Sequence, residues 1–315
     1  MKFTGYLLKP GYLFARDPIL GNLRYVPATG PAGFVQGSPS SEPCRWSDEQ
    51  QFTHVLTRDL AVMETEVTRR AWEALKAKQP KLPADPTCPE FGSGKANPVQ
   101  CVTWCEAVLF ANLLAVSEDL TRCYYTDASK RIPIDGSNYL SGKYYCDFEA
   151  CGYRLPTEAE WEWFCRAGTT GPFSVNESRY TSKDCGKPSL PGMFPELEAV
   201  AWFSANSSES RTSPVGTKKA NPWNLKDVHG NALEWCWDWL ATYPHPKRTN
   251  YAGPGRGTYR VERGGSFGFP AKACRSAFRD GDTPDYRGGS TGFRLVRKID
   301  WALDDPACDD GEPSP

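Results

Sequence analysis

Hydrophobic residues recur at helical spacing in three short stretches of the chain, and a capping residue precedes each stretch. In the first stretch Trp72 and Leu75 fall on the same side of a helical turn. Thr68 stands directly before it, where a threonine side chain can accept a hydrogen bond from the first turn. This pattern predicts a helix over residues 69–75.

The other two helical stretches open with capping boxes, in which a threonine is followed three residues later by a glutamate. One box occupies residues 103–106 and is followed by a wide apolar face, which predicts a helix over about 104–116. The second box occupies residues 157–160. Trp161 and Phe164 follow it three positions apart, so a short third helix is expected there.

Strand signals are short and concentrated near the N-terminus. Residues 23–27 and 32–38 read as two strands joined by a Gly/Pro turn, and residues 52–56 read as a third strand. Between 120 and 152 the chain is rich in Tyr, Gly, Ser and Cys without helical spacing. From residue 168 onward Gly, Pro, Asn, Asp and Trp dominate, which is typical of long loops anchored by aromatic side chains.

Charge and hydropathy exclude two classes of partner. The 315 residues carry a formal net charge of -1 with a pI of about 6.4, and no Lys/Arg-rich run is present. The long-range positive field of a nucleic-acid-binding protein is therefore absent. No apolar run approaches the roughly 20 residues that span a bilayer, and residues 1–10 are too short and too interrupted for a signal peptide. We expect neither a nucleic-acid partner nor a membrane span.

The twelve cysteines give opposing indications of localisation. Their number suits an extracytoplasmic, oxidising compartment, whereas the lack of a signal peptide suits the cytoplasm or a chain already trimmed to its mature part. Cys123, Cys146 and Cys151 are candidates for stapling the 120–152 excursion. The spacing of cysteines and histidines does not match a zinc or iron centre. The three histidines are His54, His229 and His245.

Five motifs follow one another in a fixed order. They are Thr-Glu-Val-Thr at 65–68, a Tyr-Arg-Leu-Pro-Thr-Glu run at 153–162, His-Gly-Asn-Ala-Leu-Glu-Trp at 229–235, Arg-Gly-Gly-Ser at 263–266 and Gly-Phe-Arg at 292–294. In order, spacing and wording they resemble the formylglycine-generating enzyme (sulfatase-modifying factor) family.

This resemblance implies an α+β fold, loop-rich and C-type-lectin-like, with few short helices and strands. It covers a domain over residues 20–298, preceded by an N-terminal extension at 1–19. Residues 299–315 form an acidic tail that is expected to be disordered.

The founding enzymes of the family resemble copper-dependent oxidases with two cysteines, five residues apart, shortly after the Arg-Gly-Gly-Ser motif. Two thiolates are the ligands that Cu(I) prefers. Counted from Ser266, the first of these positions is Phe269, which has no ligand atom, and the second is Cys274. We therefore expect no copper and no sulfatase activation. Cys274 is interpreted as a small buried residue or as half of a disulfide, with Cys236 as a candidate partner.

The loop that begins at Asp227 resembles a structural calcium site in the family, because carboxylate and carbonyl oxygens on a glycine turn suit a hard cation. The ligands implied by the resemblance are the Asp227 and Glu234 carboxylates and the Gly230 and Ala232 carbonyls. The alternative is that Glu234 pairs with a buried arginine, such as Arg263 or Arg294, and that no metal binds.

Some relatives of this fold display a variable ligand-binding patch, among them the target proteins of diversity-generating retroelements. The corresponding segment here alternates framework residues with candidate contact residues, and Phe269, Phe278 and Tyr286 are its aromatic anchors. The predicted ligand-binding residues are Phe267, Gly268, Phe269, Pro270, Phe278, Asp280, Asp282, Tyr286 and Ser290. An ordinary family surface that has merely drifted would show the same pattern.

The sequence therefore predicts a non-catalytic protein that binds a protein or other macromolecular ligand through residues 267–290. The alternative is an enzyme, either a formylglycine-generating-type oxidase or a related protein-modifying enzyme with a relocated thiol site. Four aspartates could in principle supply an acid–base pair for hydrolysis, but their spacing is not diagnostic. These are Asp238, Asp280, Asp282 and Asp285.

Overall fold

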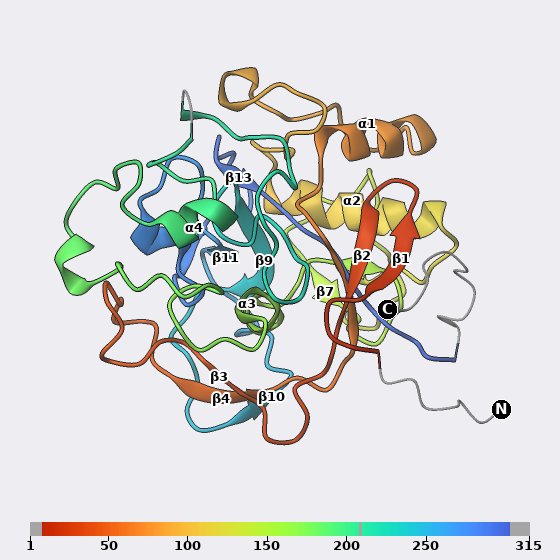
Figure 1. Cartoon of the computed structure of the whole chain (residues 1–315). Helices are drawn as coiled ribbons and strands as arrows, with labels where there is room; N and C mark the ends of the chain where they lie inside the picture. The colour runs from red at the N-terminus through yellow and green to blue at the C-terminus, as the bar shows by residue number, and fades with distance from the viewer. Residues whose placement is uncertain (1–7, 208–209, 303–315) are drawn as a thin grey trace.

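The computed structural model describes residues 8–207 and 210–302 (Figure 1). Its largest sheet has the strand order β1-β2-β5-β14-β8, and every neighbouring pair is antiparallel. The strands are β1 Leu13–Asp17, β2 Gly21–Val26, β5 Leu60–Met63, β14 Val296–Lys298 and β8 Tyr153–Arg154.

This sheet joins the two ends of the described chain. β1 lies within residues 1–19, the segment predicted as an N-terminal extension, and it pairs with β2. β14 pairs with β5 on one side and β8 on the other. Of the tail predicted over 299–315, residues 303–315 lie outside the described part of the chain.

The predicted strands near the N-terminus are confirmed, although not all of them belong to the same sheet. Residues 23–27 overlap β2 of the five-stranded sheet. Two others form a separate three-stranded sheet with a strand that the sequence did not predict, in the order β10-β4-β3. These strands are β3 Phe34–Gln36, β4 Phe52–Val55 and β10 Arg248–Thr249.

All three predicted helices are present with their caps. They are α1 Arg69–Lys78, α2 Trp104–Ser117 and α3 Glu158–Arg166, and a short α4 Pro195–Val200 joins them. Both capping boxes form, at Thr103–Glu106 and at Thr157–Glu160. α2 lies under α1, and every residue from Trp104 to Ala115 is buried, so it is a core helix and not an amphipathic one (Figure 1).

Helix α2 also organises the 120–152 excursion. The Asn112 amide donates to the carbonyls of Tyr124 and Ile134 at 2.8 and 2.9 Å and accepts from the Tyr124 N–H at 3.0 Å. The excursion contains the pair β6 Tyr124–Tyr125 and β7 Tyr145–Cys146. Cys123 and Cys146 carry free thiols. The expected stapling between them is therefore wrong, because one buried asparagine supplies the cross-links.

A four-stranded sheet carries the C-terminal motifs, in the order β12-β11-β9-β13. Its strands are β9 Leu233–Trp239, β11 Arg260–Arg263, β12 Asp280–Asp282 and β13 Thr291–Gly292. Short 3-10 helices lie outside the sheets, among them η1 Pro89–Phe91, η2 Ser182–Asp184 and η4 Ala271–Cys274.

Among the described residues two disulfides are formed, Cys44–Cys185 and Cys88–Cys101. Neither is the pairing expected from the sequence. Cys236 and Cys274 are both buried free cysteines. Cys236 packs beside Trp161 and Val261 in one hydrophobic cluster, whereas Cys274 belongs to another cluster around Phe173 and Phe203. The proposed Cys236–Cys274 bridge is wrong for this reason.

None of the helices within residues 8–207 and 210–302 combines the length and the apolar character that crossing a bilayer requires.

Candidate functional site

The 267–290 segment is fixed to the rest of the molecule by three arginines that flank or punctuate it. Arg263 donates to Glu162 and to the carbonyl of Ser276, both at 2.7 Å. Arg275 bonds to both Glu49 oxygens, at 2.5 and 2.8 Å. These pairs are shielded from water and leave the segment little freedom.

The third arginine, Arg279, forms a bidentate pair with Glu158 of α3, with N···O distances of 2.6 and 2.8 Å. Although burial alone would raise the pKa of Glu158, the Arg279 and Arg263 charges hold it below its ordinary value. The segment is therefore tied to α3 by charge as well as by packing.

A glycine allows the sharpest bend of the segment. Gly265 has φ +72°, and a Cβ there would lie 2.7 Å from the Ala273 carbonyl oxygen. Gly268, three residues later, has no atom within 4 Å of the position of a Cβ. One glycine is thus a framework requirement and the other faces open space.

The predicted contact residues divide into supports and surface. Phe267 and Phe278 are only 5% and 6% exposed, so they support the surface and are not exposed contacts. Phe267 stacks on Phe91, and the Phe278 ring meets the edge of Trp46. Trp46 is itself 53% exposed, and sequence reasoning did not identify it because it lies far from the segment in the chain.

The remaining predicted residues reach solvent to different degrees. Gly268 and Tyr286 are exposed, and the others are partly buried: Phe269, Pro270, Asp280, Asp282 and Ser290. The Ser207 hydroxyl donates to the Phe267 carbonyl, and the Ser204 N–H donates to the Phe269 carbonyl. The 204–207 loop therefore borders the segment at its N-terminal end.

The thiols near the segment are neutral. Cys274 and Cys165 have no exposed surface, and their proximity contributes to a raised pKa of the Cys274 thiol, behind burial as the main cause. Burial raises the pKa of Cys165 to about 12. With a phenyl ring at position 269 and protonated thiols at 165 and 274, these residues do not fit the thiolate pair of a copper oxidase.

His229, which borders these thiols, is a structural residue. Its Nδ1 donates to the Cys274 carbonyl at 2.8 Å, because Nε2 accepts from the Ser174 N–H at 3.1 Å. Burial lowers its pKa to about 4, so it is neutral at physiological pH.

In the loop that begins at Asp227, Glu234 pairs with a buried arginine, which was the alternative to calcium binding by this carboxylate. Its carboxylate binds the Arg294 guanidinium at 2.7–3.1 Å and also accepts from the Trp161 indole at 2.8 Å. Both Glu234 oxygens already accept hydrogen bonds, so Glu234 is not free to bind calcium together with Asp227, Gly230 and Ala232.

Asp227 retains an unsatisfied oxygen. Its Oδ2 accepts from the Gly216 N–H at 2.6 Å, while Oδ1 is buried without a partner. Burial raises the pKa of this carboxyl to about 6. A calcium ion here stays a prediction, and it would have to displace Arg294 from Glu234 or bind without that carboxylate.

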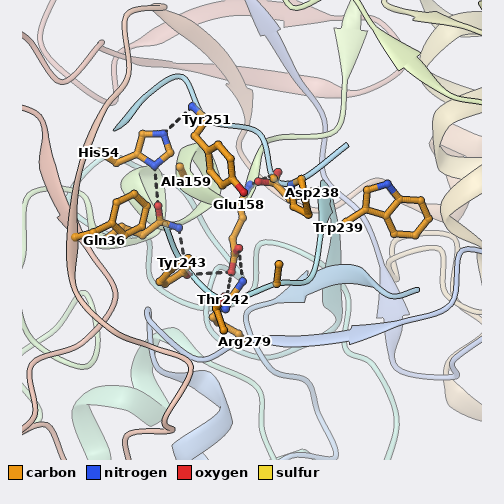
Figure 2. A pocket seen from close by; sticks show the side chains of 14 residues that line it. Gln36, His54, Glu158, Ala159, Asp238, Trp239, Thr242, Tyr243, Tyr251 and Arg279 are labelled. Atoms are coloured by element: carbon orange, nitrogen blue, oxygen red, sulfur yellow. Dashed lines mark hydrogen bonds and ion pairs between the residues drawn. The ribbon is translucent and has the colours of Figure 1, made fainter. Parts of the chain in front are cut away.

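A buried polar network connects α3 with the three-stranded sheet (Figure 2). His54 Nδ1 donates to Gln36 at 2.8 Å, Gln36 donates to the Tyr243 hydroxyl at 3.1 Å, and Tyr243 donates to Glu158 at 3.0 Å. His54 Nε2 accepts from the Tyr251 N–H at 3.1 Å, and burial lowers the pKa of His54 to about 4. Sequence reasoning missed this network because its members come from distant segments.

The space within this network is small. It amounts to about 10 Å³, which is room for one water molecule at most. Asp238 lines it and accepts from the Glu158 N–H at 2.8 Å, and burial raises its pKa well above the ordinary value, with the Glu158 charge adding to the effect. Asp238 is therefore a buried carboxyl whose neutral form is favoured, and it does not belong to an accessible acid–base pair.

Comparisons with known proteins agree with this architecture. The sequence profile described as sulfatase-modifying factor enzyme 1-like domain matches residues 30–299. The chaperone protein LppX of Paenibacillus barcinonensis is 26% identical over 253 residues, which cover 78% of this chain and 82% of the relative. A formylglycine-generating enzyme of Streptomyces coelicolor is 35% identical over 155 residues, which cover 47% of this chain and 48% of that enzyme.

Two solved structures share the fold over most of their length. Variable protein 1 of Treponema denticola superimposes with a TM-score of 0.70 at 29% identity, covering 88% of this chain and 95% of that one. PvdO from Pseudomonas aeruginosa superimposes with a TM-score of 0.70 at 24% identity, covering 93% and 100%. The expected mixed α+β architecture with few helices and many short strands is thereby confirmed.

Proposed function

Because this chain belongs to the family of sulfatase-modifying factor enzyme 1-like domains, we propose that it uses the family scaffold to bind a protein or other macromolecule without catalysis. The binding surface is formed by residues 267–290. The observation that carries the proposal is the pairing of a phenyl side chain at position 269 with fully buried, protonated thiols at 165 and 274. Oxidation of a substrate thiol through copper needs the opposite arrangement.

The division of the segment into framework and surface supports a binding role. Arg263, Arg275 and Arg279 are buried in ion pairs, whereas Gly268 and Tyr286 between and after them face solvent. A rigid frame that presents exchangeable side chains loses little conformational entropy on binding. The likeness to a structure named as a variable protein accords with such a surface.

Catalysis is tested with the copper-loaded protein and a cysteine-containing peptide. We expect no oxygen consumption, and an unchanged peptide mass, at protein concentrations where a formylglycine-generating enzyme converts the same peptide. Turnover would contradict the proposal and would favour the enzyme alternative. In that case the variants Cys165→Ser and Cys274→Ser would show whether these thiols form the relocated site, because the two thiols are close enough for Cys165 to affect the pKa of Cys274. Loss of turnover in either variant would identify the thiol involved.

The scaffold role predicts opposite responses of two glycines. Gly268→Tyr places a side chain in open space, so the free energy of unfolding should change by no more than about 0.5 kcal/mol. Gly265→Ala places a Cβ against the Ala273 carbonyl and should lower the free energy of unfolding by about 2 kcal/mol. Urea unfolding of both variants measures the difference. Equal sensitivity at the two positions would show that the surface is part of the fold and cannot be exchanged.

A further inference from the structure

Three carboxylates meet on the edge of the four-stranded sheet, at the C-terminal end of the 267–290 surface. β12 pairs antiparallel with β11, and Glu262 lies directly opposite Asp280. Opposed residues project from the same face of a sheet, as do residues two apart in one strand, so Asp282 shares that face. We call Glu262, Asp280 and Asp282 the edge carboxylates.

None of the described residues forms an ion pair with an edge carboxylate, although other buried carboxylates of this molecule have arginine partners. Arg260 lies two residues before Glu262 and directly opposite Asp282. Its guanidinium is nevertheless directed to the rings of Trp104 and Trp239, at 3.7 and 3.6 Å from their centroids. The edge carboxylates therefore form an acidic group that no fixed cation balances.

Glu262 is the deepest member of the group. Residue 262 is only 3% exposed, yet Oε1 of its side chain has no hydrogen-bond partner. The carboxylate interacts with the Thr291 hydroxyl of β13. A buried carboxylate oxygen without a donor is costly, and nothing in the hydrogen bonding of the described chain relieves it.

The two aspartates are the outer members. Each accepts one hydrogen bond from the next N–H of its own strand, Gly281 to Asp280 at 2.9 Å and Thr283 to Asp282 at 3.0 Å. Both are partly exposed, so a ligand can reach them from solvent. Their charges raise the pKa of Glu262, after burial as the larger cause, to about 8.

Tyr286 borders the group. It is 45% exposed, and its ring lies close to Gly288 and Thr291 because a Cβ on Gly288 would approach both side chains at 2.8 and 2.7 Å. The edge carboxylates also raise the pKa of Tyr286, after desolvation, which places its ring within their field. An aromatic face beside carboxylates is a favourable surround for an organic cation.

We propose that the edge carboxylates and Tyr286 bind the ammonium or guanidinium group of a basic side chain on a protein partner. The inference rests on the proposed binding function and specifies the chemistry of one part of its surface. Within the described residues, no group of three His, Cys, Asp or Glu side chains is arranged to hold a metal ion, which favours an extended organic cation with several donors. Such a group supplies the donor that Glu262 Oε1 lacks.

The proposal is tested with the full chain and short peptides immobilised at low ionic strength. The probe carries one arginine or lysine, and matched peptides carry citrulline or norleucine in its place. The basic peptides should bind at least tenfold more tightly than the neutral ones, and the affinity should fall with added salt. Free arginine amide, used as a competitor, distinguishes recognition of the cation alone from recognition that needs the peptide.

Variants assign the binding to this site. Glu262→Gln, Asp282→Asn and Tyr286→Ser should each weaken the basic peptides at least fivefold. Glu196→Gln, which removes an exposed carboxylate on α4, should leave the affinity unchanged. Glu262→Gln keeps the size of this buried side chain and removes only the charge that it can acquire beside a bound cation. The Tm should therefore be retained, and loss of binding would not reflect unfolding.

Three results would overturn the proposal: no binding of basic peptides at millimolar concentration, equal binding of neutral peptides, or unchanged binding by the variants. Displacement of the basic peptide by micromolar Ca²⁺ or Mn²⁺ would also overturn it, in favour of a metal site. None of these results bears on the copper and glycine experiments, so failure here is distinguishable from failure of the proposed function.

Discussion

At the scale of single residues, this molecule is held together by arginine–glutamate pairs that exclude water. Arg154 with Glu160, Arg263 with Glu162 and Arg294 with Glu234 have almost no exposed side-chain surface. A buried ion pair is costly to break, because removal of one partner leaves an unpaired charge. These pairs therefore fix the positions of the loops that contain them.

The sequence foreshadowed only some of these pairs. The Glu234–Arg294 contact was one of the two interpretations open for Glu234, and the 157–160 capping box accounted for Glu160 at the start of α3. Arg279 with Glu158 could not be predicted, because the partners are distant in the chain and either residue would also suit a solvated surface. The sequence shows which residues carry a charge that needs a partner when it is buried, but only the fold shows which residue is that partner.

Acid sensitivity is a prediction at this scale. His229 and His54 are buried, and burial lowers the pKa of each to about 4 from an ordinary value of 6.5. The unfolded chain therefore binds protons more readily than the folded chain between these values. The free energy of unfolding should fall as the pH drops from about 6.5 to 4, by about 3 kcal/mol for each histidine.

Urea unfolding at several pH values isolates one of these histidines when the wild type is compared with His229→Gln. The variant should be less stable at pH 7, where the native hydrogen bonds of His229 are intact. Its deficit should shrink toward pH 4. A deficit that stays constant across this range would show that His229 does not titrate as described.

At the scale of elements, the sequence predicted the helices, because a helix and its cap depend on residues that are close together in the chain. The capping boxes and α1 were found for this reason. The sheet orders were not predicted, since β5 pairs with β14 from the far end of the chain and β4 pairs with β10 in parallel. The Cys44–Cys185 disulfide was not predicted for the same reason, since its partners have a sequence separation of 141.

The two disulfides should contribute unequally. Cys44–Cys185 closes a loop with a sequence separation of 141, whereas Cys88–Cys101 closes one of 13. In the chain-entropy account, these loops correspond to about 5 and about 3 kcal/mol. The double variant Cys44→Ser/Cys185→Ser should therefore lose more stability than Cys88→Ser/Cys101→Ser.

Denaturation of both disulfide variants beside the oxidised wild type measures this order. Reduction of the wild type should reproduce the sum of the two losses. The reverse order would mean that native contacts around Cys88 and Cys101, and not loop closure, determine the effect.

At the scale of the whole molecule, the boundary of the domain matters for its stability. The family profile begins at residue 30, but β1 and β2 precede it and cover the edge of β5. The Asp17 carboxylate also accepts from the N–H groups of Ile19 and Leu20 at 2.7 and 2.8 Å. These contacts make residues 13–26 part of the core.

A chain that begins at residue 30 lacks β1 and β2 and should consequently aggregate or unfold. The reason is that the edge of β5 in a hydrophobic sheet would be left unpaired and exposed. The full chain is the control. Thermal unfolding and size-exclusion chromatography compare the two proteins. A monomeric, folded protein beginning at residue 30 would show that β1 and β2 are dispensable.

The position of β14 also has a consequence for biosynthesis. β1, β2 and β5 leave the ribosome well before β14 and can pair with one another, but β14 is the strand that joins β5 to β8. Until β14 follows, β5 has one unsatisfied side that can pair with the same strand of another nascent copy. Crowded polysomes are therefore where this protein is most exposed to misassembly, and slower initiation or a holding chaperone should raise its yield.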